Sequence, residues 1–297
     1  MTAAPVASAP LVLGGRTFDA RRPAVMGIIN RTPDSFYASA RYLDDAAALR
    51  RAEQMVDEGV DLIDVGGVRA GQEGEWVDEA TEIGRVRPFV MALRERYPRL
   101  PISLDTWRAE VALACEGAVD LVNDTWQGAD PDLVHVAARL DAGYVVSHTG
   151  GLPPRTDPVG VDYGPGDAVV EDVLRVLADG ARRAVDAGVR PNGVLVDPTL
   201  DFGKTTPNSL ALVAATDRVV ALGFPVLQAI SRKDFVGETL DLPTDDRLEG
   251  SLAATAVAAW LGATVFRAHD VRATRRVLDM VASIRGDRPP ARADRGR

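Results

Sequence analysis

Short apolar runs recur along most of this chain, and they constrain its fold more than any other feature. Eight runs are rich in branched aliphatic residues and have the length of buried strands. They are VMGII (25 to 29), LIDV (62 to 65), ISLD (102 to 105), LVND (121 to 124), YVVSH (144 to 148), VLVD (194 to 197), VLQAI (226 to 230) and VFRAH (265 to 269). Nearly continuous apolar strands are typical of a parallel sheet that is covered on both faces.

Segments with helical periodicity lie between these runs, for example over residues 45–60, 132–143, 172–189 and 249–262. Several of them end in a glycine suited to a helix C-cap. Eight strand and helix units predict a single-domain (β/α)₈ barrel of the TIM type. A doubly wound open sheet is the structural alternative, because it uses the same alternation of strands and helices.

The two ends of the chain are expected to lie outside this repeat. Residues 11–19, LVLGGRTFD, have two short β-prone runs around a Gly-Gly pair. They predict a hairpin that closes the bottom of the barrel. We expect a flexible N-terminus over residues 1–10, a barrel over residues 11–286 and a disordered tail over residues 287–297.

The composition argues against several classes of partner. Of the 297 residues, 46% are hydrophobic and 26% are charged, which allows a packed core. The net charge of -9 argues against nucleic acid and anionic membranes as partners. Neither a targeting segment nor an apolar membrane span is visible. Because Cys115 is the only cysteine, no internal disulfide is possible, and we expect a cytoplasmic protein.

Polar side chains stand at the carboxyl ends of all eight predicted strands. They are Asn30, Asp64, Asp105, Asn123, His148, Asp197, Ser231 with Lys233, and Arg267 with His269. The loops that follow barrel strands build the active site, so we expect these residues to face one cavity. Helix N-capping is an alternative for Asp105 and for Asp197, but it does not account for polar residues at all eight ends.

The residue types at these strand ends indicate the chemistry of a ligand. Asp105, Asn123 and Asp197 offer carboxylate and amide groups that match the N–H-rich edge of a flat heterocycle. Lys233 and Arg267 supply donors for an anion such as a phosphate group. The predicted ligand is therefore flat, polar and phosphorylated.

Other kinds of active site fail on spacing. Residues 201–204, DFGK, contain the kinase Asp-Phe-Gly triplet, but the Gly-rich loop and the catalytic segment of kinases are missing. The three histidines form no HxH or HExxH pair, which argues against a hydrolytic zinc site. The GxSxG elbow of a serine hydrolase is also absent. Trp107, Trp126 and Trp260 are interpreted as core residues, with cavity lining as the alternative.

Seven motifs, in chain order, together resemble the dihydropteroate synthase family. They are MGIINRTPDSF (26 to 36), DLIDVGG (61 to 67), ISLDT (102 to 106), VNDT (122 to 125), VDPTLDFGK (196 to 204), SRKDFVGE (231 to 238) and FRAHDV (266 to 271). The resemblance implies a (β/α)₈ barrel that joins 6-hydroxymethyl-7,8-dihydropterin pyrophosphate to p-aminobenzoate in folate synthesis. It also implies that pyrophosphate departs before the aniline nitrogen attacks.

The resemblance further implies roles for residues of this chain. The pterin would be held by Asp105, Asn123, Asp197, Lys233 and Phe202. The pyrophosphate would be held by Asn30, Arg267 and His269, with Mg²⁺ bound to the phosphates and to Asn30. Since stabilisation of the leaving group is the main catalytic contribution, the catalytic candidates are Lys233, Arg267 and His269.

The second substrate and the assembly follow from the same resemblance. The p-aminobenzoate side would be formed by Ser231, Arg232 and Phe36, with Phe36 in a mobile first loop that closes over it. Members of the family form homodimers. The apolar stripe over residues 271–286 is either part of such an interface or the inner face of the last barrel helix.

Two loops of this chain depart from the family pattern. After NRTPDSF the family continues with an acidic residue and two glycines, where this chain reads YASARYLD, including Ala38 to Ala40. After DVGG the family has an acidic residue and then Ser-Thr-Arg-Pro-Gly, where Val68 to Gly74 reads VRAGQEG. The family's Thr and Arg positions therefore hold Ala70 and Gly71. The methionines that flank the strand-end histidine in the family are replaced by Ser147 and Thr149.

These departures leave alternatives to a working synthase. The pattern resembles the divergent second homologue of some actinobacteria, for which a paralogue with little or no synthase activity that still binds pterin or sulfone and sulfonamide ligands is one alternative. Arg69, two positions before Gly71, is a candidate substitute for the missing arginine. A pterin-dependent methyl-transfer domain shares the barrel, but it does not call for SRK with RAHDV as an anion site.

Overall fold

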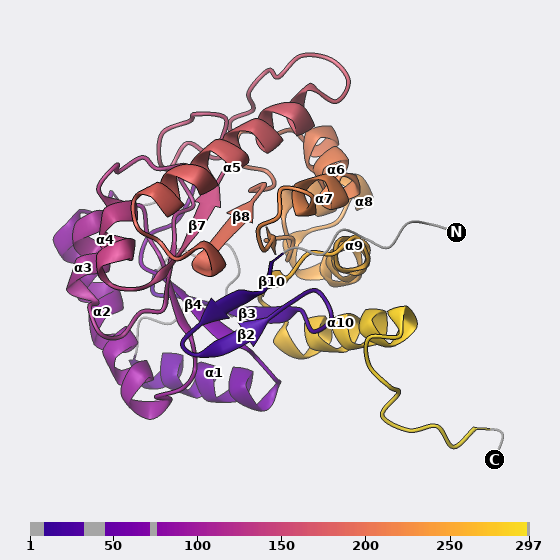
Figure 1. Cartoon of the computed structure of the whole chain (residues 1–297), viewed down its shortest axis with the longest axis horizontal. Helices are drawn as coiled ribbons and strands as arrows, with labels where there is room; N and C mark the ends of the chain where they lie inside the picture. The colour runs from indigo at the N-terminus through magenta and orange to yellow at the C-terminus, as the bar shows by residue number, and fades with distance from the viewer. Residues whose placement is uncertain (1–8, 33–44, 72–75, 296–297) are drawn as a thin grey trace.

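Eight parallel strands form the centre of the molecule in the computed structural model, which describes residues 9–32, 45–71 and 76–295 (Figure 1). The strands are β3 (Ala24–Asn30), β4 (Leu62–Gly66), β5 (Ile102–Asp105), β6 (Leu121–Asn123), β7 (Gly143–Ser147), β8 (Val194–Asp197), β9 (Leu227–Gln228) and β10 (Val265–Ala268). Their order is β8-β7-β6-β5-β4-β3-β10-β9, and a parallel bridge between Val196 and Val226 joins the two ends of this sheet. The predicted barrel is confirmed, and the doubly wound alternative is wrong.

Helices cover the outside of the barrel (Figure 1). They are α1 (Asp45–Asp57), α2 (Glu79–Arg96), α3 (Ala109–Ala114), α4 (Leu133–Arg139), α5 (Ala168–Asp186), α6 (Thr206–Ala214), α7 (Thr216–Val220), α8 (Asp234–Leu240), α9 (Leu248–Trp260) and α10 (Val271–Arg285). In the part of the chain that the structure describes, no helix is long and apolar enough to cross a membrane.

Local sequence signals account for several helix ends. Asp78 caps the start of α2, because its side chain accepts a hydrogen bond of 2.8 Å from the backbone N–H of Thr81. Gly59, Gly188 and Gly262 follow α1, α5 and α9 with φ of 89°, 103° and 104°. These left-handed conformations are the ones that glycine adopts without strain, so the predicted glycine stops are confirmed at these three helices.

The predicted N-terminal hairpin closes one end of the barrel. Strands β1 (Leu11–Leu13) and β2 (Arg16–Phe18) pair in antiparallel register around the Gly-Gly turn. Leu11, Leu13 and Phe18 are buried and cluster with the inward-facing side chains near the start of the strands, namely Ala24, Met26, Leu62, Leu121, Val145, Leu195, Leu227 and Val265. Apolar packing thus fills the bottom of the barrel and leaves the carboxyl ends of the strands for polar residues.

Candidate active site

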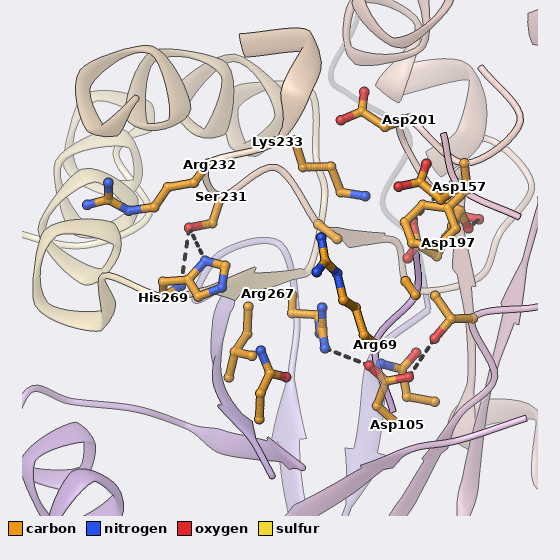
Figure 2. A pocket seen from close by; sticks show the side chains of 18 of the residues that line it. Arg69, Asp105, Asp157, Asp197, Asp201, Ser231, Arg232, Lys233, Arg267 and His269 are labelled. Carbon is orange, nitrogen blue, oxygen red and sulfur yellow. Dashed lines mark hydrogen bonds and ion pairs between the residues drawn. The ribbon is translucent and has the colours of Figure 1, made fainter. Parts of the chain in front are cut away.

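A cavity lies at the carboxyl ends of the barrel strands. It is lined by strand-end residues from most of the barrel, namely Asn30, Asp105, Asn123, Asp197, Ser231, Lys233, Arg267 and His269. Figure 2 shows charged side chains from distant parts of the chain converging there. The structure also places Phe202 and Arg232 in the lining. Phe36 and Ala38 to Ala40 lie outside the described residues, as do the last three residues of the segment Val68 to Gly74.

Two of the strand-end residues do not line this cavity, so the expectation of one shared cavity is wrong for them. Asp64 lies within β4 rather than at its end, and it is fully buried against Ser103 Oγ at 2.6 Å. His148 follows β7, and its Nε2 lies 3.0 Å from Asp172 Oδ2 on α5. Its imidazole is therefore turned toward the helix layer. Burial lowers the pKa of His148 to about 4, although Asp172 opposes this shift.

The floor of the cavity is an arginine held between two carboxylates. Arg267 Nε donates to Asp64 Oδ2 at 2.6 Å, and its Nη2 donates to Asp105 Oδ2 at 2.7 Å. Thr125 Oγ1 donates to the other oxygen of Asp105 at 2.7 Å. Burial raises the pKa of Asp105 to about 6, while the Arg267 guanidinium opposes the shift. The floor therefore carries a fixed positive group and a carboxyl that titrates near neutral pH.

Acceptor groups occupy one wall of the cavity. The Asn123 amide nitrogen donates to both oxygens of Asp64 at 3.3 Å, which leaves its carbonyl oxygen available to a ligand. Asp197 is 4% exposed, and one of its oxygens accepts a hydrogen bond from Thr199 N at 2.7 Å. Burial raises the pKa of Asp197, and the nearby ammonium of Lys233 lowers it in part. This wall suits a heterocycle that presents N–H donors.

Aromatic rings give the cavity a flat apolar side. The Lys233 ammonium lies 4.3 Å from the ring centroid of Phe202 and donates to the carbonyl of Leu200 at 2.5 Å. Trp126 packs edge-on against Phe202, with the two ring centroids 5.2 Å apart. Trp126 is nearly buried and also lines the cavity, as does Trp107. The interpretation of Trp260 as a core residue is wrong, because its side chain is 51% exposed on α9.

A serine and a histidine form the opposite side of the cavity (Figure 2). Ser231 Oγ accepts from the backbone N–H of His269 at 3.2 Å and lies 3.1 Å from His269 Nδ1. We assign the hydroxyl proton to this second contact, which leaves the imidazole proton on Nε2. Burial, with Arg267 close by, lowers the pKa of His269 to about 3. His269 is therefore a neutral side chain at physiological pH.

Two further arginines in the lining are held by carboxylates. Arg232 pairs in a fork with Asp270, at 2.9 Å from Nε and 3.2 Å from Nη2, and it also donates to backbone carbonyls that include Asp245 O at 2.7 Å. Arg247 Nη1 lies 2.7 Å from Asp234 Oδ1. The forked pair fixes the Arg232 guanidinium, and each arginine has its charge compensated by a carboxylate.

Two loops place further charged residues in the cavity, and neither residue stands at the end of a predicted strand. Arg69 and Asp157 both line the cavity, and Figure 2 shows both side chains in it. A parallel backbone bridge joins Gly71 to Asp157, and Arg155 Nε donates to the carbonyl of Gly71 at 3.3 Å. The segment after β4 is thereby attached to the long loop between β7 and α5. Asp157 has no sequence signal of its own, since it follows neither a strand nor a helical repeat.

Comparison with known proteins gives matches along most of the chain. Residues 26–269 match the family described as pterin binding enzyme. The protein named inactive dihydropteroate synthase 2 of Mycobacterium leprae is 55% identical over 96% of this chain and 98% of its own length. The dihydropteroate synthase of Clostridium beijerinckii is 35% identical over 92% of this chain and 98% of its own length.

A solved structure agrees with these sequence matches. It is a dihydropteroate synthase from Coxiella burnetii in complex with pteroic acid, and it superimposes with a TM-score of 0.83 at 32% sequence identity. The alignment covers 94% of this chain and 99% of that one. The alignment therefore extends over nearly the whole length of both chains.

Proposed function

Because the chain belongs to the pterin binding enzyme family, we propose that it is a transferase of the dihydropteroate synthase type. It would condense 6-hydroxymethyl-7,8-dihydropterin pyrophosphate with p-aminobenzoate and release pyrophosphate. The observation that carries this proposal is the meeting of a buried acceptor wall with the Lys233 and Arg267 cations in one cavity. Such a cavity matches a ligand that has a donor-rich ring at one end and an anion at the other.

The acceptor wall is the proposed pterin site. Asp105, Asn123 and Asp197 would accept hydrogen bonds from the ring N–H and amino groups, and Phe202 would lie against the ring. The wall is buried, so a ligand that lacked these donors would leave acceptor groups without partners. Lys233 lines the same cavity with its ammonium against the Phe202 ring, and a ring carbonyl or ring nitrogen of the pterin would accept from this ammonium.

The proposed pyrophosphate site is formed by Asn30, Arg267 and His269. A departing pyrophosphate gains negative charge, and a positive group fixed in advance stabilises that charge without rearranging. Arg267 is fixed in this sense by its two carboxylate partners. The neutral imidazole of His269 would donate its Nε2 proton to a phosphate oxygen, which costs less than keeping a second buried cation.

Magnesium is the proposed cofactor of the pyrophosphate step. In the described ranges, no group of three or more His, Cys, Asp or Glu side chains is arranged to hold a metal ion. Asn30 Oδ1 nevertheless lies near the Asp105 carboxylate, because a Cβ at Gly66 would be in van der Waals contact with both, at 3.6 Å from Asn30 Oδ1 and 3.5 Å from Asp105 Oδ2. This single amide oxygen fits a Mg²⁺ ion that keeps several waters and is held mainly by phosphate oxygens. When bound, the ion would neutralise charge on the leaving group.

The proposed amine site lies on the side of Ser231 and Arg232. The forked pair between Arg232 and Asp270 holds the guanidinium in place beside this side of the cavity. The Ser231 hydroxyl oxygen would accept a hydrogen bond from the amine there, because its proton is directed to His269 Nδ1, and Phe36 from the first loop would contribute as well.

A second candidate function is a pterin-binding paralogue with little turnover. The specific observation that favours it is the second loop, where Ala70 and Gly71 replace the family's Thr and Arg at the rim of the cavity. The name of the Mycobacterium leprae relative describes that protein as inactive. Both candidates use the same pterin site, so they differ in the rate of the transfer and not in the ligand.

The product assay separates the two candidates. Purified protein would be incubated with pterin pyrophosphate, p-aminobenzoate and Mg²⁺, and both pyrophosphate and dihydropteroate would be quantified. A synthase forms the two products in equal amounts. Calorimetric binding of pterin pyrophosphate without product formation indicates the paralogue, and absence of both binding and turnover refutes both candidates.

The protein is further proposed to be a cytoplasmic homodimer. Helices α9 and α10 pack against each other, and they expose Val257 and Trp260 on α9 and Met280 and Ile284 on α10. Their side chains are 48%, 51%, 61% and 60% exposed. A second copy of the chain would cover this apolar surface across a two-fold axis. The single buried cysteine, Cys115, is in keeping with a reducing compartment.

A further inference from the structure

Asp157 is the one residue of the long β7–α5 loop whose carboxylate enters the cavity. It is half-buried, and it lines the cavity together with Asp197 and Lys233 (Figure 2). The backbone bridge to Gly71 and the Arg155 contact to the same residue hold this part of the loop against the segment after β4. The backbone at Asp157 is therefore held in place by its bridge to Gly71.

The Asp157 carboxylate differs from the other carboxylates of the lining in its hydrogen bonds. Asp105 accepts from Thr125 and Arg267, and Asp197 accepts from Thr199 N. Asp201 accepts from Ser209 Oγ at 3.0 Å and from the first backbone N–H of α8 at 2.8 Å. By contrast, no group within residues 9–32, 45–71 and 76–295 donates a hydrogen bond to the Asp157 carboxylate or forms an ion pair with it.

The charges near Asp157 make a missing donor costly. Burial raises the pKa of Asp157, and the carboxylates of Asp201 and Asp234 raise it further, while the Lys233 ammonium and, more weakly, the Arg69 guanidinium lower it. Lys233 reaches the carbonyl of Leu200 and the ring of Phe202, and it makes no ion pair with Asp157. A carboxylate can only accept hydrogen bonds, so Asp157 calls for a donor on the ligand itself.

We infer that Asp157 selects the reduced form of the pterin ring by accepting a hydrogen bond from a ring N–H. In the fully oxidised ring, the two nitrogens of the pyrazine half carry lone pairs, which a carboxylate repels. Reduction to the 7,8-dihydro form places a hydrogen on one of these nitrogens, and further reduction to the tetrahydro form places one on each. This inference rests on the proposed pterin site and adds to it a residue that discriminates between redox states of the ligand.

The test compares three ligands with three proteins. Calorimetry under anaerobic conditions would measure the binding of 6-hydroxymethylpterin and of its 7,8-dihydro and tetrahydro forms. The proteins are the unchanged chain, the isosteric Asp157→Asn variant and the control Asp162→Asn. Asp162 lies in the same loop, is exposed and accepts from the backbone N–H of Gly164 at 2.9 Å, a contact that asparagine retains.

The unchanged protein and the control are expected to bind the reduced forms about tenfold more tightly than the oxidised form, the size of one hydrogen bond to a charged group. Asp157→Asn is expected to reduce this ratio to about twofold or less, because an amide can donate to a ring lone pair as well as accept from a ring N–H. Binding of the oxidised form should become tighter in this variant.

Two results would overturn the inference, and they are distinguishable. If the pterins bind but the ratio is the same in Asp157→Asn as in the control, or is near one in the unchanged protein, the redox selection is wrong and the pterin site stands. If none of the three ligands binds to the unchanged protein, the proposed pterin site is wrong as well.

Discussion

Arg267 and Asp105 form an ion pair across the floor of the cavity, with Arg267 Nη2 at 2.7 Å from Asp105 Oδ2, although 162 residues separate them in the chain. The same guanidinium pairs with Asp64, so one cation compensates a fully buried carboxylate and a partly exposed one. The pair belongs both to the fold and to the candidate site, because it closes the floor and also faces the ligand. Substitutions in it should therefore affect stability and binding together.

We predict that Arg267→Ala destabilises the protein by about 3 to 5 kcal/mol, because it leaves Asp64 and Asp105 without their common partner. Arg267→Lys keeps the charge but not the fork, so it should lose less stability while still weakening pyrophosphate binding at least tenfold. Urea unfolding and calorimetry would measure the two effects. Equal stability of the alanine variant and the unchanged protein would contradict the role assigned to the pair.

The pH dependence of pterin binding should report the ionisation of Asp105. Burial raises the pKa of this carboxyl to about 6, so it is ionised above that pH and accepts from the ligand. Affinity for the pterin should therefore fall as the pH is lowered from 7 to 5. Asp105→Asn should remove most of this slope, and an unchanged slope in that variant would assign the effect to another group.

The effect of Asp105 on stability has the opposite sign. Between its ordinary pKa of 3.8 and its native pKa of about 6, the native protein binds a proton that the unfolded chain has released. This carboxyl thus favours the native state as the pH falls through 6. His269 acts in the other direction, because its pKa is lowered to about 3 and the unfolded chain is protonated first, from about pH 6.5 downward. Comparing unfolding of Asp105→Asn and the unchanged protein from pH 7 to 5 isolates the first contribution.

Lys233→Ala should weaken pterin binding by tenfold or more under both candidate functions, since both use one pterin site. The ammonium lies against the Phe202 ring in the lining of the cavity, and alanine removes the donor that the pterin would use. Lys233→Arg is the matched variant, because it keeps the charge in a longer side chain. Unchanged pterin affinity in the alanine variant would remove Lys233 from the site.

The sequence is sufficient to predict the barrel because its strands are unbroken apolar runs, and it predicts most of the floor because residues such as Asp105 end those strands. It does not predict the direction of a side chain near a strand end. Asp64 lies two residues before the end of β4 and is buried below the cavity, and His148 is turned toward α5. Asp157 could not be identified, since its place depends on a backbone bridge to Gly71 between two loops without periodicity.

The exposed apolar residues of α9 and α10 predict a dimer that charge would disrupt. The double substitution Met280→Asp and Ile284→Asp would place two carboxylates in the proposed interface, where burial without a partner is costly. Analytical ultracentrifugation should show a dimer for the unchanged protein and a monomer for this variant. Val159→Asp, at a partly exposed apolar position in the β7–α5 loop, is the control and should remain dimeric. A monomeric unchanged protein would exclude the proposed assembly.

The loop after β4 is the feature that distinguishes an active synthase from a paralogue with little turnover. Restoring the family's residues in this loop would test which of the two functions the protein has. Ala70, which lines the cavity, and Gly71 beside it take the places of the family's Thr and Arg. If the loop limits the rate, the double substitution Ala70→Thr and Gly71→Arg should raise kcat about a hundredfold, which is the magnitude of one positioned charged donor in a transition state. Its pterin affinity should stay within a few-fold, because the acceptor wall is untouched.

Arg69 provides the complementary variant for the same loop. Its side chain enters the cavity from the segment that Gly71 attaches to the β7–α5 loop. If Arg69 contributes to the pyrophosphate site, Arg69→Ala should weaken binding of pterin pyrophosphate about tenfold and leave 6-hydroxymethylpterin unaffected, because only the first ligand carries the anion. Equal losses for both ligands would instead show that Arg69 supports the fold of the loop. In that case an effect on turnover is expected from the arginine of the Gly71→Arg variant and not from Arg69.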